Sequence, residues 1–186
     1  MPPPIPVVLT AYDPEWPKIA ADHAERLWTL GSIIVAVHHI GSTSVPGLSA
    51  KPIIDLMPLV TDLAELDRLR SRVEALGYDW HGELGISGRR YCALSDGAGL
   101  RIAQLHFFTA DSPQVERHIA FRDYLRAHRD VALAYETEKR RARDLHPDDS
   151  HAYTDEKAGW IRDTEAKALD WFAASRSTQD IRRISK

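Results

Sequence analysis

The segment from His39 to Met57, HIGSTSVPGLSAKPIIDLM, gathers residue types that suit metal-assisted phosphate chemistry. A glycine and several hydroxyl residues follow one apolar run, and a single carboxylate, Asp55, lies in the next apolar run. Gly41 allows the backbone to approach an anion closely, and the loop hydroxyls and amides can bond phosphate oxygens. Asp55 can hold a divalent ion that bridges those phosphates. The other interpretation is an ordinary turn between strands with a solvated acid at a strand end.

Basic residues near this segment are candidates for phosphate contacts. Lys51 precedes the Asp55 run, and Arg89 and Arg90 open a later strand-like run after a glycine-rich turn. Because neighbours on a strand point to opposite faces, only one arginine of the pair can face the site. Charge-assisted bonds from it would hold a phosphate tail, although basic residues at strand starts are also commonly solvated. The residues predicted to bind nucleotide are Gly41, Ser42, Thr43, Ser44, Lys51 and Arg90.

His106 lies within an apolar strand-like run and is the second candidate for chemistry. A neutral imidazole can ligate a metal or take a proton near pH 7. A lone histidine in such a run is more often a hydrogen-bonded structural residue. We expect Ser42, Asp55 and His106 to meet at one site, with Asp55 and His106 as the catalytic residues and the metal ligands.

Five strands are predicted to position these residues. Apolar runs bounded by turn residues place the strands at 33–40, 53–60, 78–80, 89–94 and 100–108. The first two are joined by the glycine-hydroxyl loop. His106 and Asp55 should therefore belong to one sheet.

Helices are predicted before, between and after the strands. The first should run from residue 14 to 30 with Asp13 as its N-cap, and the second from 62 to 76 behind a capping box of Asp62 and Glu65. After Pro113 the chain is predicted to be helical, with Thr154 capping the last helix. This order favours an α+β fold, a mixed sheet with helices on one face and a helical C-terminal part. We expect one domain over residues 1–175 and a polar tail over 176–186.

Composition narrows the class of protein. The chain has 186 residues with 44% hydrophobic content, enough for a sizeable core. Its 24 Lys and Arg are outnumbered by 27 Asp and Glu, which disfavours general nucleic-acid binding. Cys92 is the single cysteine, so no internal disulfide can form. With no signal peptide or long apolar run recognised, we expect a cytoplasmic protein that does not enter a membrane.

Several segments together resemble a known family. HIGSTSVPGLSAKPIIDLM closely resembles the signature of the GrpB family, whose members have a nucleotidyltransferase-like fold related to polymerase beta. The resemblance covers roughly residues 7 to 172 in order, which is far more specific than one motif. The other matching segments are Tyr12 to Trp16, Arg89 to Tyr91, Leu105 to Phe107, Phe121 to Arg126, and Tyr153-Thr154 with Lys157 and Ile161.

The resemblance implies a nucleoside triphosphate bound with Mg²⁺ or Mn²⁺, and transfer of a nucleotidyl or phosphoryl group to a small acceptor. It also places His106 where active nucleotidyltransferases usually carry a third acid. Active members usually have two acids separated by one residue, but Ile53 and Met57 flank Asp55 at that spacing. Two-metal chemistry needs several anionic ligands. A non-catalytic nucleotide-binding or folding-accessory module therefore remains the alternative, with a metal-dependent phosphohydrolase as a third. The sequence does not indicate the acceptor, the base or the oligomeric state.

Overall fold

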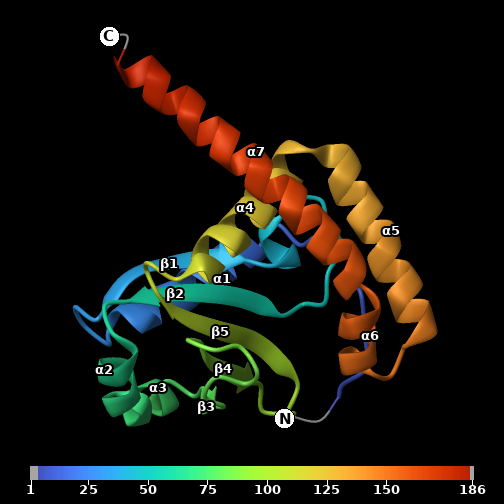
Figure 1. Cartoon of the computed structure of the whole chain (residues 1–186). Helices are drawn as coiled ribbons and strands as arrows, with labels where there is room; N and C mark the ends of the chain where they lie inside the picture. The colour runs from blue at the N-terminus through green and yellow to red at the C-terminus, as the bar shows by residue number, and fades with distance from the viewer. Residues whose placement is uncertain (1–3, 185–186) are drawn as a thin grey trace. The chain divides into compact units, whose positions relative to one another are not determined.

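The computed structural model describes the backbone of residues 4–184 and the side chains of residues 4–176 (Figure 1). The chain forms two compact units: Leu9–Val115 is the body of one, and the other combines Pro4–Val8 with the chain from Glu116 onward. All the described strands belong to the first unit. The single domain predicted over residues 1–175 stays a prediction. Of the polar tail predicted at 176–186, all side chains after residue 176 lie outside the described part of the chain.

The first unit is built on a five-stranded mixed sheet in the order β1-β2-β5-β4-β3. The bounds are β1 Ile34–Ile40, β2 Ile54–Val60, β3 Asp79–Trp80, β4 Arg90–Ser95 and β5 Arg101–Thr109. β2 and β5 are parallel, and the other neighbouring pairs are antiparallel. The predicted mixed sheet is thus confirmed, with strand ends within two residues of those expected from the apolar runs.

One face of this sheet carries the hydrophobic core of the unit. Three helices contribute to that core: α1 (Trp16–Trp28), α2 (Leu63–Arg68) and α3 (Arg70–Ala75). Their buried side chains join alternate residues of the central strands, which point to one face because strand side chains alternate. The members include Trp16, Leu27, Leu66 and Val73 from the helices, and Ile54, Leu56, Cys92, Leu105 and Phe107 from the strands. The residues between them on β2 and β5 therefore point to the opposite face.

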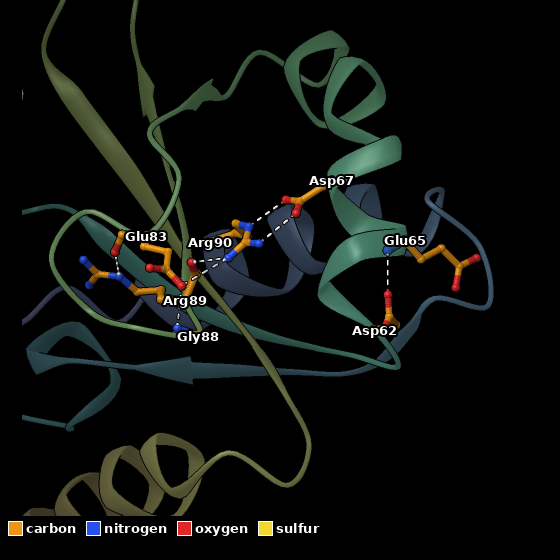
Figure 2. A network of polar contacts seen from close by, with 7 residues as sticks. All are labelled: Asp62, Glu65, Asp67, Glu83, Gly88, Arg89 and Arg90. Atoms are coloured by element: carbon orange, nitrogen blue, oxygen red, sulfur yellow. Dashed lines mark hydrogen bonds and ion pairs between the residues drawn. The ribbon is translucent and has the colours of Figure 1, made fainter.

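Two helix predictions in the first unit need correction. α1 begins at Trp16, and its N-cap residue Glu15 is itself helical and makes no capping bond. Asp13 instead accepts a bond from the Glu15 amide at 2.9 Å, so it closes the turn before the helix. The helix predicted at 62–76 is divided at Leu69, although Asp62 caps α2 as expected by accepting the Glu65 amide at 2.7 Å (Figure 2).

The second unit consists largely of helices: α4 (Pro113–Ala127, starting in the first unit), α5 (Arg129–Leu145), α6 (Ser150–Glu156) and α7 (Ala158–Ile184). Thr154 does not cap the last helix as predicted. It lies inside α6, which begins after Asp149, and the Asp149 carboxylate accepts two amides of the first turn.

The N-terminal segment pairs with the chain just before α6. The Val7 amide donates to Pro147 O at 2.7 Å, and the Ser150 amide donates to Ile5 O at 3.1 Å. Among residues 4–184, no helix has the length and apolar character that crossing a membrane requires.

Candidate functional site

Asp55 and His106 meet on the sheet face opposite the hydrophobic core. Asp55 pairs in register with Gln104 across the parallel β2–β5 ladder, and His106 follows two residues later on the same face of β5. Asp55 Oδ1 lies 3.5 Å from His106 Nε2, and both side chains are partly buried. The predicted convergence of these two residues is confirmed.

The Asp55 carboxylate also lies against the loop that follows β1. Gly41 has φ +69° and ψ −174°, a backbone conformation that is essentially restricted to glycine. A Cβ added to Gly41 would overlap Asp55 Oδ2. Ile40 is the register partner of Asp55, so the β1–β2 ladder fixes this approach. Gly41 is therefore required both for the sharp turn and for the proximity of the carboxylate.

The hydroxyls after Gly41 have different surroundings. Residues 42–44 form a short 3₁₀ turn, in which Thr43 and Ser44 are buried. Ser44 Oγ donates to Gly41 O at 2.6 Å, and Thr43 Oγ1 lies 2.9 Å from His39 Nε2. The Ser42 side chain is half-buried and therefore more accessible than those of Thr43 and Ser44. Thr43 and Ser44 thus shape the loop, and Ser42 is the hydroxyl best placed to bond an added ligand.

Arg89, which was not predicted as a ligand residue, is the arginine that contacts His106. Its guanidinium is buried and donates to Glu83 O at 3.1 Å and to Leu84 O at 2.7 Å. It also lies 5.1 Å from the Tyr91 ring centroid, in a cation–π contact. One terminal nitrogen lies 3.4 Å from His106 Nδ1.

This contact selects a tautomer of His106. A guanidinium can only donate, so Nδ1 must accept, and the neutral ring then carries its proton on Nε2. Nε2 is the atom that faces Asp55. A metal bond from Nε2 would need a lone pair that this tautomer lacks. The arrangement therefore favours His106 as a donor that holds Asp55 over His106 as a metal ligand.

Arg90 faces the other way. Tyr91 is the register partner of His106, so Arg90 points to the opposite face of β4. It forms a two-bond ion pair with Asp67 of α2, at 2.6 Å and 2.7 Å (Figure 2). The hydrogen bond from Arg90 lowers the pKa of the Asp67 carboxyl. The predicted phosphate contact from Arg90 is therefore not supported by its position, because its guanidinium binds α2 on the side of the hydrophobic core.

Lys51, the remaining predicted residue, lies between Ala50 and β2. Ala50 pairs with Thr10 in an isolated bridge that precedes the strand. Lys51 therefore follows this bridge and precedes the strand that carries Asp55. Its role in binding phosphate stays a prediction.

Two further residues of the site, Tyr91 and Gln104, were also missed. Tyr91 donates from its hydroxyl to Gln104 Oε1 at 2.6 Å, and its ring lies edge-on to the His106 ring with centroids 5.4 Å apart. Burial raises the pKa of Tyr91 to about 12, so the hydroxyl stays a proton donor at neutral pH. The only sequence signal for Gln104 is its spacing of two from His106, which places both on one face of a strand.

The donor set is small for a metal site. No group of three or more His, Cys, Asp or Glu side chains is placed to hold an ion among the described residues. Neighbouring ligands of one octahedral ion lie about 3 Å apart, so the Asp55–His106 spacing alone would permit a shared ion. Because the His106 tautomer opposes this, Asp55 is the protein ligand that fits Mg²⁺ or Mn²⁺, and the remaining positions would fall to water and phosphate oxygens.

Comparison with known proteins identifies relatives that match most of the chain. A protein from Bacillus subtilis, UPF0157 protein YqkA, is 38% identical over 166 residues, which are 89% of this chain and 48% of that protein. This chain thus spans about half the length of YqkA. A dephospho-CoA kinase from Mycolicibacterium paratuberculosis is 31% identical over 89% of this chain and 47% of its own length.

A solved structure also matches most of this chain. The crystal structure of the conserved protein GrpB from Enterococcus faecalis shares 38% identity with a TM-score of 0.83, covering 89% of this chain and 99% of that one. A family model described as GrpB protein matches residues 6–167. This range includes the glycine-hydroxyl loop, Asp55, Arg89 and His106. The chain therefore belongs to the GrpB family.

Proposed function

We propose that this protein binds a nucleoside triphosphate with a divalent ion and transfers a nucleotidyl or phosphoryl group to a small acceptor. Asp55 would hold Mg²⁺ or Mn²⁺, and Ser42 with the loop amides would bond the phosphates. The ion would neutralise phosphate charge and orient the reacting group. The observation that carries this proposal is the close approach of the Asp55 carboxylate to the Gly41 backbone. It places a carboxylate beside a glycine-hydroxyl loop, whose amides and hydroxyls can bond phosphate oxygens.

His106 has a supporting role in this proposal. Its Nε2–H would hold Asp55 in the orientation that presents an oxygen to the ion, and Arg89 would keep the ring in the required tautomer. Arg89 would thus act through His106, whereas Arg90 was expected to contact the phosphate tail directly. A buried guanidinium that already bonds two carbonyl oxygens is a rigid support, since its donors are fixed before any ligand binds.

A second function is favoured by a separate observation. Asp55 is the single carboxylate of β2, and no larger metal-binding group occurs among the described residues. A site with one carboxylate can bind a metal–nucleotide complex without supplying the ligands that two-ion transfer requires. The non-catalytic module therefore uses the same binding residues and differs only in turnover.

One experiment separates these functions. The protein is incubated with each nucleoside triphosphate and Mg²⁺ or Mn²⁺ across a panel of small acceptors, and pyrophosphate and nucleoside diphosphate are measured. Release above the level of the Asp55→Asn variant supports transfer. Calorimetric binding without release favours the module, and the absence of both overturns the proposal.

The Asp55→Asn variant tests the metal role directly. The change keeps the side-chain size and removes the charge, so we expect metal-dependent nucleotide affinity to fall at least about tenfold, equivalent to about 1.4 kcal/mol. Affinity without metal should change little. Asp22→Asn is a matched control, because Asp22 lies on α1 and pairs with Lys18 at 2.8 Å. Equal affinity of Asp55→Asn and the unmodified protein for the metal–nucleotide complex would exclude Asp55 as a ligand.

A further inference from the structure

The residue directly across the parallel ladder from Asp55 is a glutamine. Gln104 is the register partner of Asp55, and neighbouring strands of a sheet lie about 4.8 Å apart. Both side chains point away from the hydrophobic core, because the residues on either side of them in β2 and β5 belong to that core. Gln104 is half-buried. Its side chain therefore extends from the sheet next to Asp55, on the face that carries the proposed site.

Tyr91 determines which end of the Gln104 carboxamide is offered to a ligand. The Tyr91 hydroxyl donates to Gln104 Oε1 at 2.6 Å. The Tyr91 ring is itself held in place, since the residue is only 4% exposed and lies edge-on to His106. A carboxamide whose oxygen accepts a hydrogen bond offers its NH₂ group, which has two donors, to other partners. The orientation of Gln104 is thus set by a buried tyrosine before any ligand binds.

A neutral donor at this position suits a phosphate oxygen. A carboxylate in the same place would repel the phosphate chain and could ligate a second ion. Gln104 does neither, because its oxygen accepts from Tyr91 and its NH₂ group can only donate. Hydrogen bonds to a charged acceptor are about twice as strong as those between neutral groups. The position across from Asp55 is therefore built for an anion beside one ion.

We propose that Gln104 binds a non-bridging oxygen of the polyphosphate chain through its NH₂ group, while the ion held by Asp55 binds another oxygen of the same chain. This inference rests on the proposed function and assigns to that site a direct contact between the sheet and the phosphates. Tyr91 acts through Gln104 as a positioning residue. The site thus combines one ion with one fixed amide donor.

Inorganic triphosphate is the probe for this contact, because it carries the phosphate chain and nothing else. Calorimetry with Mg²⁺ compares two variants that both break the bond between Tyr91 and Gln104. Gln104→Met also removes the NH₂ donors, so its affinity for Mg²⁺–triphosphate should fall at least about tenfold. Tyr91→Phe keeps the donors and only releases the carboxamide, so its affinity should fall clearly less. Equal losses in the two variants would make Gln104 a structural partner of Tyr91 and overturn the inference.

A second variant gives a readout that needs no phosphate. In Gln104→Glu the carboxylate can still accept from Tyr91, so the fold should be kept. Two carboxylates across the ladder hold a divalent ion more tightly than one, so Mn²⁺ affinity should rise at least about tenfold in paramagnetic resonance titrations. The rise should disappear when Asp55→Asn is added. Gln114→Glu is the matched control, because it adds the same charge in the first turn of α4, and it should leave Mn²⁺ affinity unchanged.

The possible outcomes separate this inference from the proposed function. If Gln104→Met binds Mg²⁺–triphosphate as the unmodified protein does, while Asp55→Asn binds it weakly, the Gln104 contact is wrong and the proposed function stands. If Gln104→Met alone weakens binding, the contact stands and the metal role of Asp55 fails. The inference is also overturned if Gln104→Glu leaves Mn²⁺ affinity unchanged, or if the unmodified protein binds nucleoside triphosphates but not triphosphate.

Discussion

The two faces of the β-sheet use neighbouring residues for opposite purposes. On β5, Leu105 is fully buried in the hydrophobic core, and His106 beside it contacts Asp55 on the other face. At the start of β4, Arg90 binds a carboxylate of α2, and Arg89, the residue before the strand, bonds loop carbonyls and contacts His106. On the core face, the charge of Arg90 is thus compensated by Asp67, whereas on the other face Arg89 and His106 lead to the Asp55 carboxylate.

The strongest test of this division compares the neighbours on β5. Leu105→Ala removes a side chain with no exposure and should lower the free energy of unfolding by about 2–5 kcal/mol, while metal–nucleotide affinity of the folded protein is kept. His106→Gln should do the reverse, because Gln can still donate to Asp55 but cannot reproduce the imidazole geometry. Denaturant unfolding and calorimetric binding on both variants provide the comparison. A His106→Gln protein that is destabilised but binds normally would make His106 a structural residue.

A second test acts on the loop that brings the carboxylate to its place. Gly41→Ala should destabilise the protein by about 1–3 kcal/mol through backbone strain, and it should also displace the Asp55 carboxylate. Gly47→Ala is the matched control, since Gly47 also has a positive φ but leaves space around an added Cβ. Loss of metal–nucleotide affinity in the first variant alone would show that the approach of Asp55 to the loop matters. Equal losses in both would attribute the effect to strain.

Much of the β-sheet and its two faces could be predicted from the sequence, because the apolar runs indicate which segments are strands. Asp55 and His106 were predicted to converge, and they do. Arg90 was predicted to face the site, but Arg89 is the arginine that contacts His106, because alternation separates two neighbours without saying which one faces the site. That choice depends on the pairing of Tyr91 with His106, a contact between strands that no local pattern encodes. The tautomer of His106 depends on its contact with Arg89, so it could not be predicted from the sequence either.

The helix boundaries show a similar limit. Asp62 was correctly predicted as a cap, since its bond to Glu65 is local. Thr154 was wrongly predicted, because Asp149 offers its carboxylate to two amides at the true start of α6. Local capping rules identify residues that can cap a helix, but which of these residues does so depends on where the surrounding chain begins the helix.

A third test compares the two arginines. Arg89→Met removes two hydrogen bonds from a buried guanidinium to the carbonyl oxygens of Glu83 and Leu84, and a hydrogen bond to a charged group contributes about 1.5–3 kcal/mol. Arg90→Met breaks a partly exposed ion pair, for which about 0.2–1 kcal/mol is usual. We therefore expect Arg89→Met to be clearly the less stable variant in denaturant unfolding, and the only one of the two to weaken metal–nucleotide binding. A larger stability loss in Arg90→Met would reverse our assignment of the two faces.

The smallest expected effect is a pH dependence on the core side of the sheet. The hydrogen bond from Arg90 lowers the pKa of Asp67 in the folded protein below its ordinary value of 3.8. A carboxyl group with a depressed folded pKa contributes stability above its unfolded pKa and loses that contribution as pH falls through the folded pKa. Asp67 should thus stabilise the protein fully near pH 6 and lose its contribution as the pH falls below about 4.

Because the Asp67 side chain is 42% exposed, solvent screening keeps the effect on stability small. Arg90→Met should flatten the stability curve in this acid range, and Arg89→Met should leave the slope unchanged because Arg89 contacts His106 on the opposite face of the sheet. Denaturant unfolding at closely spaced pH values measures both slopes, and identical slopes for Arg90→Met and the unmodified protein would show that the ion pair does not couple folding to pH.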